Sequence, residues 1–249
     1  MMRGAGGPPG RETALKRDWT KGSIIGNLWS LYWPMLISNS INMLGPTVDM
    51  IWVGRLGAAS IAGVGVSAIA VMVVTSLMMG LFTGTMALVA RFVGAGDEES
   101  ANRAAQQAFV VSVAFSILMA IVGIFLSKPI LTLLGVEADV VTEGAAYMRI
   151  QLVGMVTMSL LSVAQSIMQA SGDTLTPMKI SIGYRLFHVA LCPFLVFGWW
   201  VFPRLGVSGA ALSNVISQGV GGGIGLWILF SGRTRLSVTL RNFRLDRSI

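Results

Sequence analysis

The sequence predicts an all-α integral membrane protein built as a bundle of six transmembrane helices. Of the 249 residues, 54% are hydrophobic, and the mean hydropathy is +0.73. Only 12% are charged, roughly half the share found in soluble domains, and too little to cover a soluble core of this size. The charges are also clustered, which leaves apolar runs long enough to cross about 30 Å of hydrocarbon.

The composition divides the chain into three regions. Residues 1–25 are polar and contain Gly and Pro, which predicts a flexible cytoplasmic leader without the apolar core of a cleaved signal peptide. Residues 26–231 hold the membrane bundle, and residues 232–249 form a basic cytoplasmic tail. The six predicted spans cover, in order, residues 27–53, 61–89, 104–126, 140–169, 178–201 and 207–230.

Proline and glycine mark special points along these spans. Pro34 and the pair Gly45-Pro46 predict kinks in the first span. Gly80 and Gly84 form a G-x-x-x-G in the second span, which predicts close approach of another helix backbone. Residues 127–139 are too short and too interrupted to cross the membrane, so we expect an amphipathic turn at the outer surface.

The distribution of Lys and Arg predicts the orientation. With the N-terminus inside, 13 of the 18 Lys and Arg residues fall in inner segments and three in outer segments. This bias predicts a multi-pass protein of the plasma (inner) membrane with both termini cytoplasmic. The net charge of +7 is concentrated at the two chain ends beside apolar spans, which favours contact with the lipid bilayer and argues against a nucleic-acid partner.

Asp49 is an acidic residue inside an apolar stretch of the first span. A carboxylate in hydrocarbon is costly and has to face the bundle interior or water. Burial penalises its charged form, so that proton uptake near neutral pH becomes possible. The position predicts a proton or sodium site. The alternative is a carboxylate near the outer interface, since Arg55 follows a few residues later.

Other polar residues accompany this acid on the first span. At helical spacing, they fall near one face together with it: Ser38, Asn39 and Asn42. Such a polar stripe is typical of a water-lined cavity. It is equally compatible with hydrogen bonds between neighbouring helices.

The fifth span carries a second polar group. Tyr184, His188 and Cys192 are spaced four residues apart and therefore share a face. His188 is the only histidine and titrates in the physiological range, although a neutral histidine hydrogen-bonded within the bundle fits equally well. Arg185 requires an anionic partner or a route for its head group to the interface, and Asp49 is a candidate partner.

The sequence also argues against several classes of site. One His and one Cys cannot make a closed zinc site, so we predict no metal centre, and a single Cys excludes an intramolecular disulfide. The sequence has no P-loop and no nucleophile elbow, so we predict that the protein is not an enzyme and uses no cofactor. The glycine-rich run at 219–225 lies in an apolar span, which favours close helix packing over a dinucleotide loop.

Several segments, in the right order, resemble one family. Residues 33–35 and 48–57 (WPM and VDMIWVGRLG) resemble the first helix of multidrug and toxic compound extrusion (MATE) transporters, and residues 87–97 (ALVARFVGAGD) resemble the end of the second. Residues 169–178 (QASGDTLTPM) resemble the loop between helices four and five, and residues 206–212 (GVSGAAL) the start of the sixth. The likeness covers the chain from about residue 25 to residue 230.

The resemblance implies one six-helix lobe, the N-terminal one, of a twelve-helix secondary transporter. The implied function is antiport, in which organic, cationic compounds leave in exchange for protons or sodium ions. The basic tail would then lead to a second lobe that this sequence lacks, so the expected partners are a small-molecule substrate and either a second six-helix lobe or a homodimer partner.

The resemblance also suggests site residues. Asp49 matches the family's coupling acid, and His188 and Cys192 stand where the family often has Asn and Asp, while Asn214 stands at a frequent Thr position. These four residues form the predicted proton or cation site. The loss of a second acid favours proton over sodium coupling. The residues assigned to the substrate cavity are Asn39, Asn42, Tyr184, Arg185 and Gln218.

Two further hypotheses stay open. One is a flippase for a lipid-linked substrate, because Arg185 and Arg149 place cations within spans. The other is a non-transporting fragment or partner subunit that requires a second lobe.

Asp173 is expected to cap the fifth helix, whose early Pro177 suits a helix start.

Overall fold

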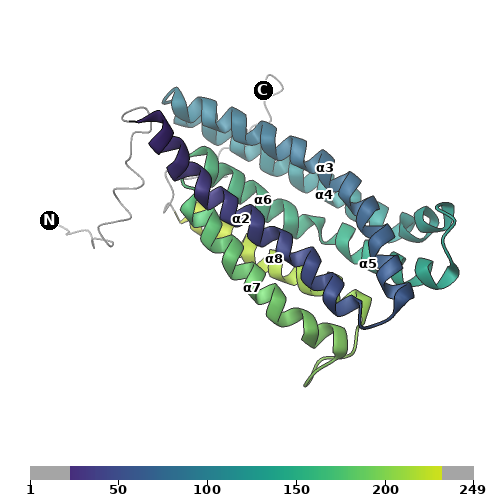
Figure 1. Cartoon of the computed structure of the whole chain (residues 1–249). Helices are drawn as coiled ribbons and strands as arrows, with labels where there is room; N and C mark the ends of the chain where they lie inside the picture. Colours follow the sequence, from purple (N-terminus) through teal and green to yellow (C-terminus); the bar gives the residue numbers. More distant parts are fainter. Residues whose placement is uncertain (1–22, 232–249) are drawn as a thin grey trace.

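The computed structural model describes residues 23–231, and this part of the chain is all-helical with no strand. The predicted leader up to residue 22 and the predicted basic tail lie outside the described residues. The seven helices are α2 (Ile24–Val53), α3 (Ala58–Gly94), α4 (Glu98–Leu133), α5 (Ala138–Val153), α6 (Met155–Ala170), α7 (Leu175–Phe197) and α8 (Val207–Phe230) (Figure 1).

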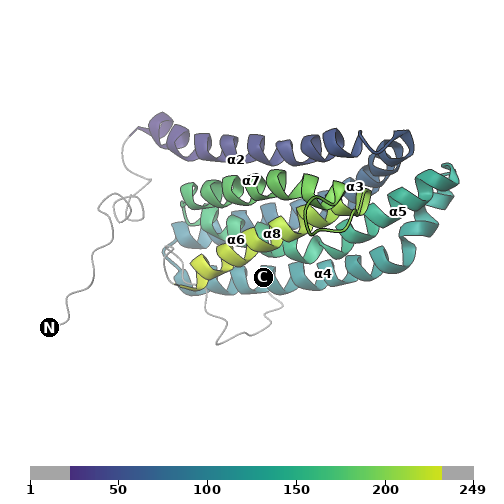
Figure 2. The same ribbon diagram turned by 90° about the horizontal axis from the view of Figure 1, so that it is seen from below.

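The helices run back and forth along one bundle. The ends of α2 and α7 meet the start of α8 in one buried cluster, through Val53, Val196 and Val207. At the other end, the last turns of α3 and α6 pack on the start of α4, through Val89, Met168 and Ala101. The described chain therefore begins and ends at the same end of the bundle (Figure 2).

The length and composition of the helices fit a membrane. Four helices are long and apolar enough to span it: α3, α4, α7 and α8. The pair α5 and α6, bent by 42° at its break, makes a fifth span if it is counted as one. The helix α2 is 30 residues long, about 45 Å at 1.5 Å per residue, but it falls outside this group because Ser, Asn and Asp side chains lower its hydropathy.

Several predicted boundaries are wrong. The helix α3 runs on to Gly94, past residue 89, and α4 begins at Glu98, before residue 104. Two further boundaries differ for an identifiable reason, and packing explains the first of them. Residues 127–133 continue α4 instead of forming a turn, with Pro129 inside the helix. The side chain of Leu131 is 1% exposed and packs against Val141 and Met148 of α5. Burial of this leucine outweighs the backbone hydrogen bond that Pro129 removes.

The second of these two boundaries is the end of the fifth span. The helix α7 ends at Phe197, four residues before the predicted boundary, because Gly198 adopts a left-handed conformation with φ of 71°. A Cβ at this position would lie 2.6 Å from the backbone nitrogen of Arg204, so both the conformation and the close approach of the chain require glycine.

The fourth predicted span is broken at Gly154. The broken pair α5–α6 replaces the single predicted helix, and α8 approaches the break so closely that a Cβ on Gly154 would lie 2.1 Å from a methyl group of Val215.

At the start of α7, the backbone N–H of Thr176 donates to the Asp173 carboxylate at 3.0 Å, which confirms the expected cap.

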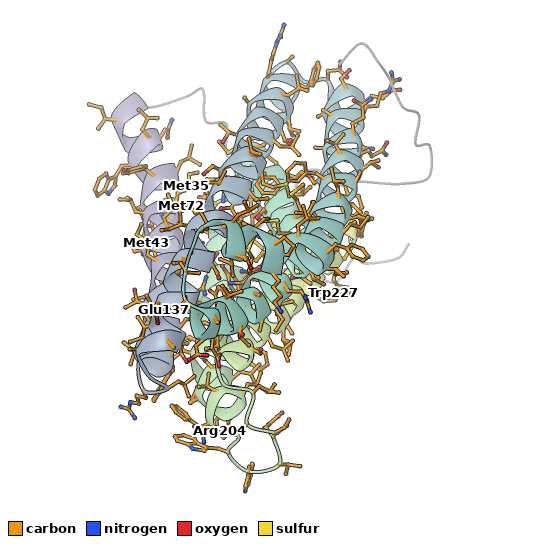
Figure 3. All side chains as sticks on the ribbon, turned by 90° about the vertical axis from the view of Figure 1, so that its right-hand side faces the viewer. Met35, Met43, Met72, Glu137, Arg204 and Trp227 are labelled. Atoms are coloured by element: carbon orange, nitrogen blue, oxygen red, sulfur yellow. The ribbon has the colours of Figure 1, made fainter. Side chains whose placement is uncertain are left out.

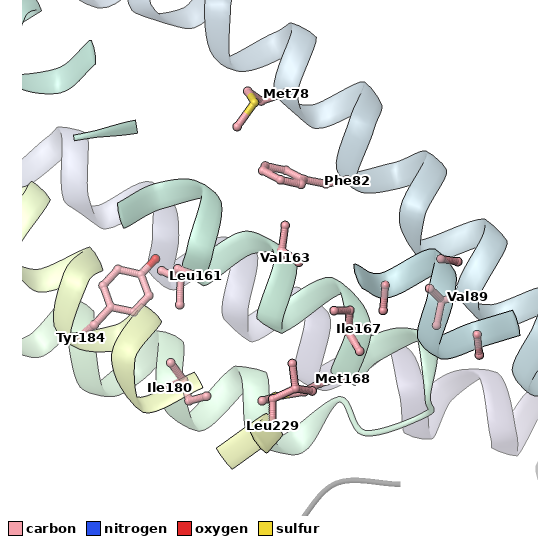
Figure 4. Close-up of a cluster of buried hydrophobic side chains, with 13 residues drawn as sticks. Met78, Phe82, Val89, Leu161, Val163, Ile167, Met168, Ile180, Tyr184 and Leu229 are labelled. Carbon is pink, nitrogen blue, oxygen red and sulfur yellow. The ribbon is translucent and has the colours of Figure 1, made fainter. Parts of the chain in front are cut away.

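The core lies between α3, α4, α6, α7 and α8. Figure 4 shows Met78 and Phe82 of α3 facing Val163 of α6, with Tyr184 of α7 and Leu229 of α8 in the same cluster. This packing joins α7 to the other helices of the core and so fixes its position.

Close helix contacts use other glycines than predicted in α3. Gly80 and Gly84 are exposed, and a Cβ on either would meet nothing within 4 Å, so the prediction of a packing role within this part of the chain is wrong. Instead, α3 meets α5 where Gly63 faces Gly144. The glycine-rich run in α8 does pack closely, since Gly221 lies against the ring of Tyr184.

Large apolar side chains cover much of the outside of the bundle, as expected for lipid-facing helices. Met43 on α2 and Met72 on α3 are 77% and 67% exposed (Figure 3).

Candidate functional site

The candidate site lies between α2 and α7. The helix α2 runs along one edge of the bundle with α7 beside it, and the two pack along much of their length (Figures 1 and 2). At the end where α2 finishes, the rings of Trp52 and Phe197 meet edge to face with centroids 5.8 Å apart. This packing fixes the relative position of the two helices close to the predicted coupling acid.

Asp49 is buried at this seam, with 2% of its surface exposed. Its Oδ1 lies 3.1 Å from Nε2 of His188 and 3.5 Å from Sγ of Cys192. Both partners are fully buried and stand four residues apart on α7, so one face of that helix presents both to the acid. The structure thus brings together three of the four residues predicted for the proton or cation site. Asp49 lies near the end of α2, as the interface alternative expects, yet its side chain is buried in the protein.

Arg185 is linked to the acid through the imidazole. Its side chain is 5% exposed, and its Nη1 lies 3.5 Å from Nδ1 of His188. A guanidinium only donates, so this contact requires Nδ1 as the acceptor, while Nε2 lies 3.1 Å from Oδ1 of Asp49 without the geometry of a hydrogen bond. Asp49, the candidate partner of Arg185, is therefore separated from it by the ring of His188.

A glycine provides the space for this arginine. A Cβ on Gly45 would lie 1.8 Å from Nη1 and 2.5 Å from Cζ of Arg185, so the guanidinium occupies the place of a side chain on α2. Arg185 also stacks over the ring of Tyr184, with Cζ 5.1 Å from the centroid, and its Nη2 donates to the Tyr184 hydroxyl at 3.4 Å. Within residues 23–231, no carboxylate lies within ion-pair distance of this arginine.

Tyr184 makes a second link across the seam. Its hydroxyl donates to Oδ1 of Asn42 on α2. Pro46, one turn later, has no N–H to offer to the backbone carbonyl of Asn42, so the backbone of α2 is weakest between its two polar contacts with α7. The side-chain contacts thus bracket the predicted kink.

The remaining predicted residues lie apart from this cluster. Asn39 is exposed, which corrects its assignment to the same face as Ser38, Asn42 and Asp49. On α8, Nε2 of Gln218 donates to Oδ1 of Asn214 at 2.9 Å, so these two residues pair with each other. In the part of the chain that is described, neither makes a hydrogen bond to Asp49.

Sequence reasoning missed two features of the site. Gly45 was read only as a helix weak point, although a glycine one turn before a buried acid is also a place where a neighbouring side chain can enter. Asp49, His188 and Cys192 were predicted to belong to one site, but the direct contact of the acid with both α7 residues could not be read from a chain in which they lie some 140 residues apart. One donor atom from each of the three lies within 4.8 Å of the others.

Chemically, this cluster can hold and release one proton in a buried place. The imidazole of His188 lies beside the Asp49 carboxylate, and the positively charged guanidinium of Arg185 contacts the other nitrogen of that ring. Protonating Asp49 would turn an acceptor into a donor and remove the charge that holds His188 and Cys192 around it.

Comparisons with known proteins agree with this architecture. The MatE family model matches residues 34–194. A probable multidrug resistance protein, YpnP of Bacillus subtilis, is 26% identical over 82% of this chain and 45% of its own length. The FAD transporter of Shewanella oneidensis is 25% identical over 68% of this chain and 37% of its own length.

A solved structure extends the likeness to the fold. A MOP superfamily transporter from Pyrococcus furiosus, described as having a binding pocket of reverse polarity that suggests a different function, superposes with a TM-score of 0.84 at 26% identity. The match covers 95% of this chain and 51% of that one, so this chain spans about half the length of the relatives it matches. From the matched family model and this shared fold, the chain belongs to the MatE family of membrane transporters.

Proposed function

We propose that this chain forms one lobe of a secondary antiporter of the plasma (inner) membrane that exports organic cations in exchange for protons. The observation that carries the proposal is the buried contact between Asp49 and His188. An intramembrane acid held by one titratable donor is the arrangement that a proton relay needs.

The surroundings of Asp49 support a proton as the coupling ion rather than sodium. A hard cation is best held by several oxygen atoms. The atoms at the carboxylate are instead a ring nitrogen and a sulfur, at 3.1 and 3.5 Å. A proton needs only the one carboxylate.

In the proposed cycle, a proton from outside reaches Asp49 when the outer side is open. Neutralising the carboxylate weakens its hydrogen bonds to α7, and α2 then bends at Gly45-Pro46, where a backbone hydrogen bond is missing. The bend changes the surface that α2 presents to the substrate, which is released as the proton binds.

The complete pathway needs a second half in this proposal. The relatives are about twice as long as this chain, and a second six-helix lobe or a second copy of the chain would supply the missing wall of the cavity. We place both termini in the cytoplasm, because the Lys and Arg bias agrees with the even number of passes along the bundle.

One observation favours a second candidate, transport of an anionic or lipid-linked compound. Arg185 is buried without a carboxylate partner among residues 23–231, and its Nε has no hydrogen-bond partner. A phosphate or carboxylate group would satisfy it. The FAD transporter and the Pyrococcus transporter described with reverse polarity show that relatives are not all described as exporters of cations.

The test uses the complete transporter in proteoliposomes with an imposed pH gradient. Asp49→Asn removes the proton site while keeping size and burial, so we expect gradient-driven efflux of a cationic dye to fall at least tenfold. Glu99→Gln, an exposed acid paired with Arg103, serves as the control and should transport normally. Efflux of wild-type size in Asp49→Asn would refute the assignment, and uptake of an anionic probe in place of the dye would favour the second candidate.

A further inference from the structure

We infer that Asp49, His188 and Cys192 form a binding site for a divalent transition metal, with Zn²⁺ the expected ligand. The three side chains come from two helices and place a carboxylate oxygen, an imidazole nitrogen and a thiol sulfur within 4.8 Å of one another. All three are buried. The inference concerns binding alone and stands independently of antiport.

Two of the three donor separations are close to those of a zinc site. With Zn–N, Zn–O and Zn–S bonds of about 2.0 to 2.3 Å, the edges of a tetrahedron are about 3.4 to 3.6 Å long. The oxygen–nitrogen edge here is 3.1 Å and the oxygen–sulfur edge is 3.5 Å. The nitrogen and sulfur donors lie within 4.8 Å of each other, so closing all three donors around one ion requires rotation of the side chains.

The donor types select the metal. Thiolate and imidazole favour Zn²⁺ and its chemical analogues Co²⁺ and Cd²⁺, whereas Mg²⁺ prefers sites made of oxygen alone. Three protein donors leave the fourth position for water, so the site is open rather than closed. This inference departs from the prediction of no metal centre, which considered only a closed site and did not count a carboxylate as the third donor.

Binding requires a defined change of protons. The thiol of Cys192 loses its proton to solvent, and the imidazole has to carry its single proton on Nδ1 so that Nε2 can take the metal. Arg185 opposes this change, because its Nη1 faces Nδ1 at 3.5 Å and its positive charge repels the ion. No other cation contacts these three residues in the described part of the chain.

The unique cysteine makes the test direct. The full transporter, purified in detergent with a histidine-free tag, is titrated with Co²⁺ as the metal probe. We expect one equivalent to produce the visible bands of tetrahedral Co²⁺ and a thiolate-to-cobalt charge-transfer band, both removed by Zn²⁺ and unaffected by Mg²⁺. Because the chain has one Cys, that band can arise from no other residue of this lobe.

Variants identify the donors. Cys192→Ser should abolish the charge-transfer band, and His188→Gln and Asp49→Asn should each weaken binding roughly tenfold or more. Thermal unfolding of each variant checks that the fold is kept. Arg185→Gln should instead tighten binding by about tenfold, since a positive charge leaves the site.

Absence of the charge-transfer band in a folded wild-type protein overturns the inference, and so does equal Co²⁺ affinity in the wild type and His188→Gln. Loss of proton coupling in Asp49→Asn, together with no metal band in the wild type, would leave the proposed function standing and remove only the metal site. A metal band in a wild-type protein that shows no proton-coupled transport would leave the metal site standing and remove the proposed function.

Discussion

Gly45 lets Arg185 of one helix lie inside the outline of another. The guanidinium occupies the position of a Cβ on α2 and contacts Nδ1 of His188 from there. Gly45 thus makes room for Arg185, which contacts Nδ1 of His188 while Nε2 of the same ring faces Asp49. Gly45 and Arg185 are therefore positioning residues for the acid.

Gly45→Ala should push the guanidinium away from His188. We expect gradient-driven transport to fall severalfold and the free energy of unfolding to drop by about 1–3 kcal/mol, as for an overpacked core. Gly80→Ala is the matched control: it lies in a helix with nothing within 4 Å of the new methyl group, so it should be neutral or stabilising by up to about 1 kcal/mol.

A double-mutant cycle distinguishes the specific contact from general damage. In the Arg185→Gln background the atoms that clash are gone, so Gly45→Ala should cost little more. Strictly additive losses of stability and transport would mean that the two residues act separately.

Asp97 shows how one side chain starts a helix outside the membrane-spanning segments. Its carboxylate accepts the backbone N–H of Ser100 at 3.0 Å at the start of α4. Hydrogen bonds from the side chain and backbone of Ser100 lower the pKa of Asp97 below its ordinary value of 3.8. A pKa that is lower in the folded state means that the ionised carboxylate stabilises the fold.

Asp97→Ala should therefore lower the melting temperature at neutral pH. The difference from wild type should shrink as the pH falls below 3.8 towards the lowered pKa, because the carboxyl is then protonated in both states. Melting in detergent across this range measures it, with Glu99→Gln in the same turn as the control. A difference that persists unchanged in acid would show that the charge of the cap is not what stabilises α4.

At the scale of helices, contact depends on which glycines face a neighbour. The backbones of α3 and α5 meet at Gly63 and Gly144, where a Cβ on Gly63 would lie 2.8 Å from the backbone nitrogen of Gly144. The Ser67 hydroxyl donates to the carbonyl of Gly144 at 2.8 Å and fixes the same crossing. Backbone atoms cannot move aside as the end of a side chain can.

Gly63→Ala should consequently separate α3 from α5 and destabilise the lobe by about 1–3 kcal/mol. Gly84→Ala, on the exposed face of the same helix, changes the same atoms without a clash. Thermal unfolding of both variants in one detergent compares the two positions. Equal stability of Gly63→Ala and Gly84→Ala would contradict the proposed crossing.

At the scale of the whole molecule, the alternating helices predict a topology that chemical labelling can test. In a Cys192→Ser background, Trp200→Cys lies in the loop after α7, where the side chain is 94% exposed. Ala95→Cys lies in the turn between α3 and α4, at the opposite end of the bundle.

If both termini are cytoplasmic, an impermeant maleimide should label Trp200→Cys in intact cells and Ala95→Cys only after permeabilisation. The reverse pattern would invert the predicted orientation. Labelling of both from outside would contradict the number of passes along the bundle.

Much of the fold followed from composition, while several details did not. The long apolar runs predicted the helices, and the observed α8 has the predicted bounds, 207–230. The extra turns at the end of α4 and the break at Gly154 were not foreseen, because each depends on a side chain from another helix: α4 continues where Leu131 is buried, and α5 and α6 part where Val215 of α8 approaches.

The candidate site divides in the same way. The sequence by itself determined the helices, the face shared by His188 and Cys192 and the presence of a buried acid, because these depend on helical spacing and on the cost of charge in hydrocarbon. Only the tertiary structure decided that Asp49 meets both residues, that Arg185 acts through an imidazole and that Gly45 makes room for it. Such contacts depend on how α2 lies against α7, and that placement results from the packing of the whole lobe rather than from any local pattern.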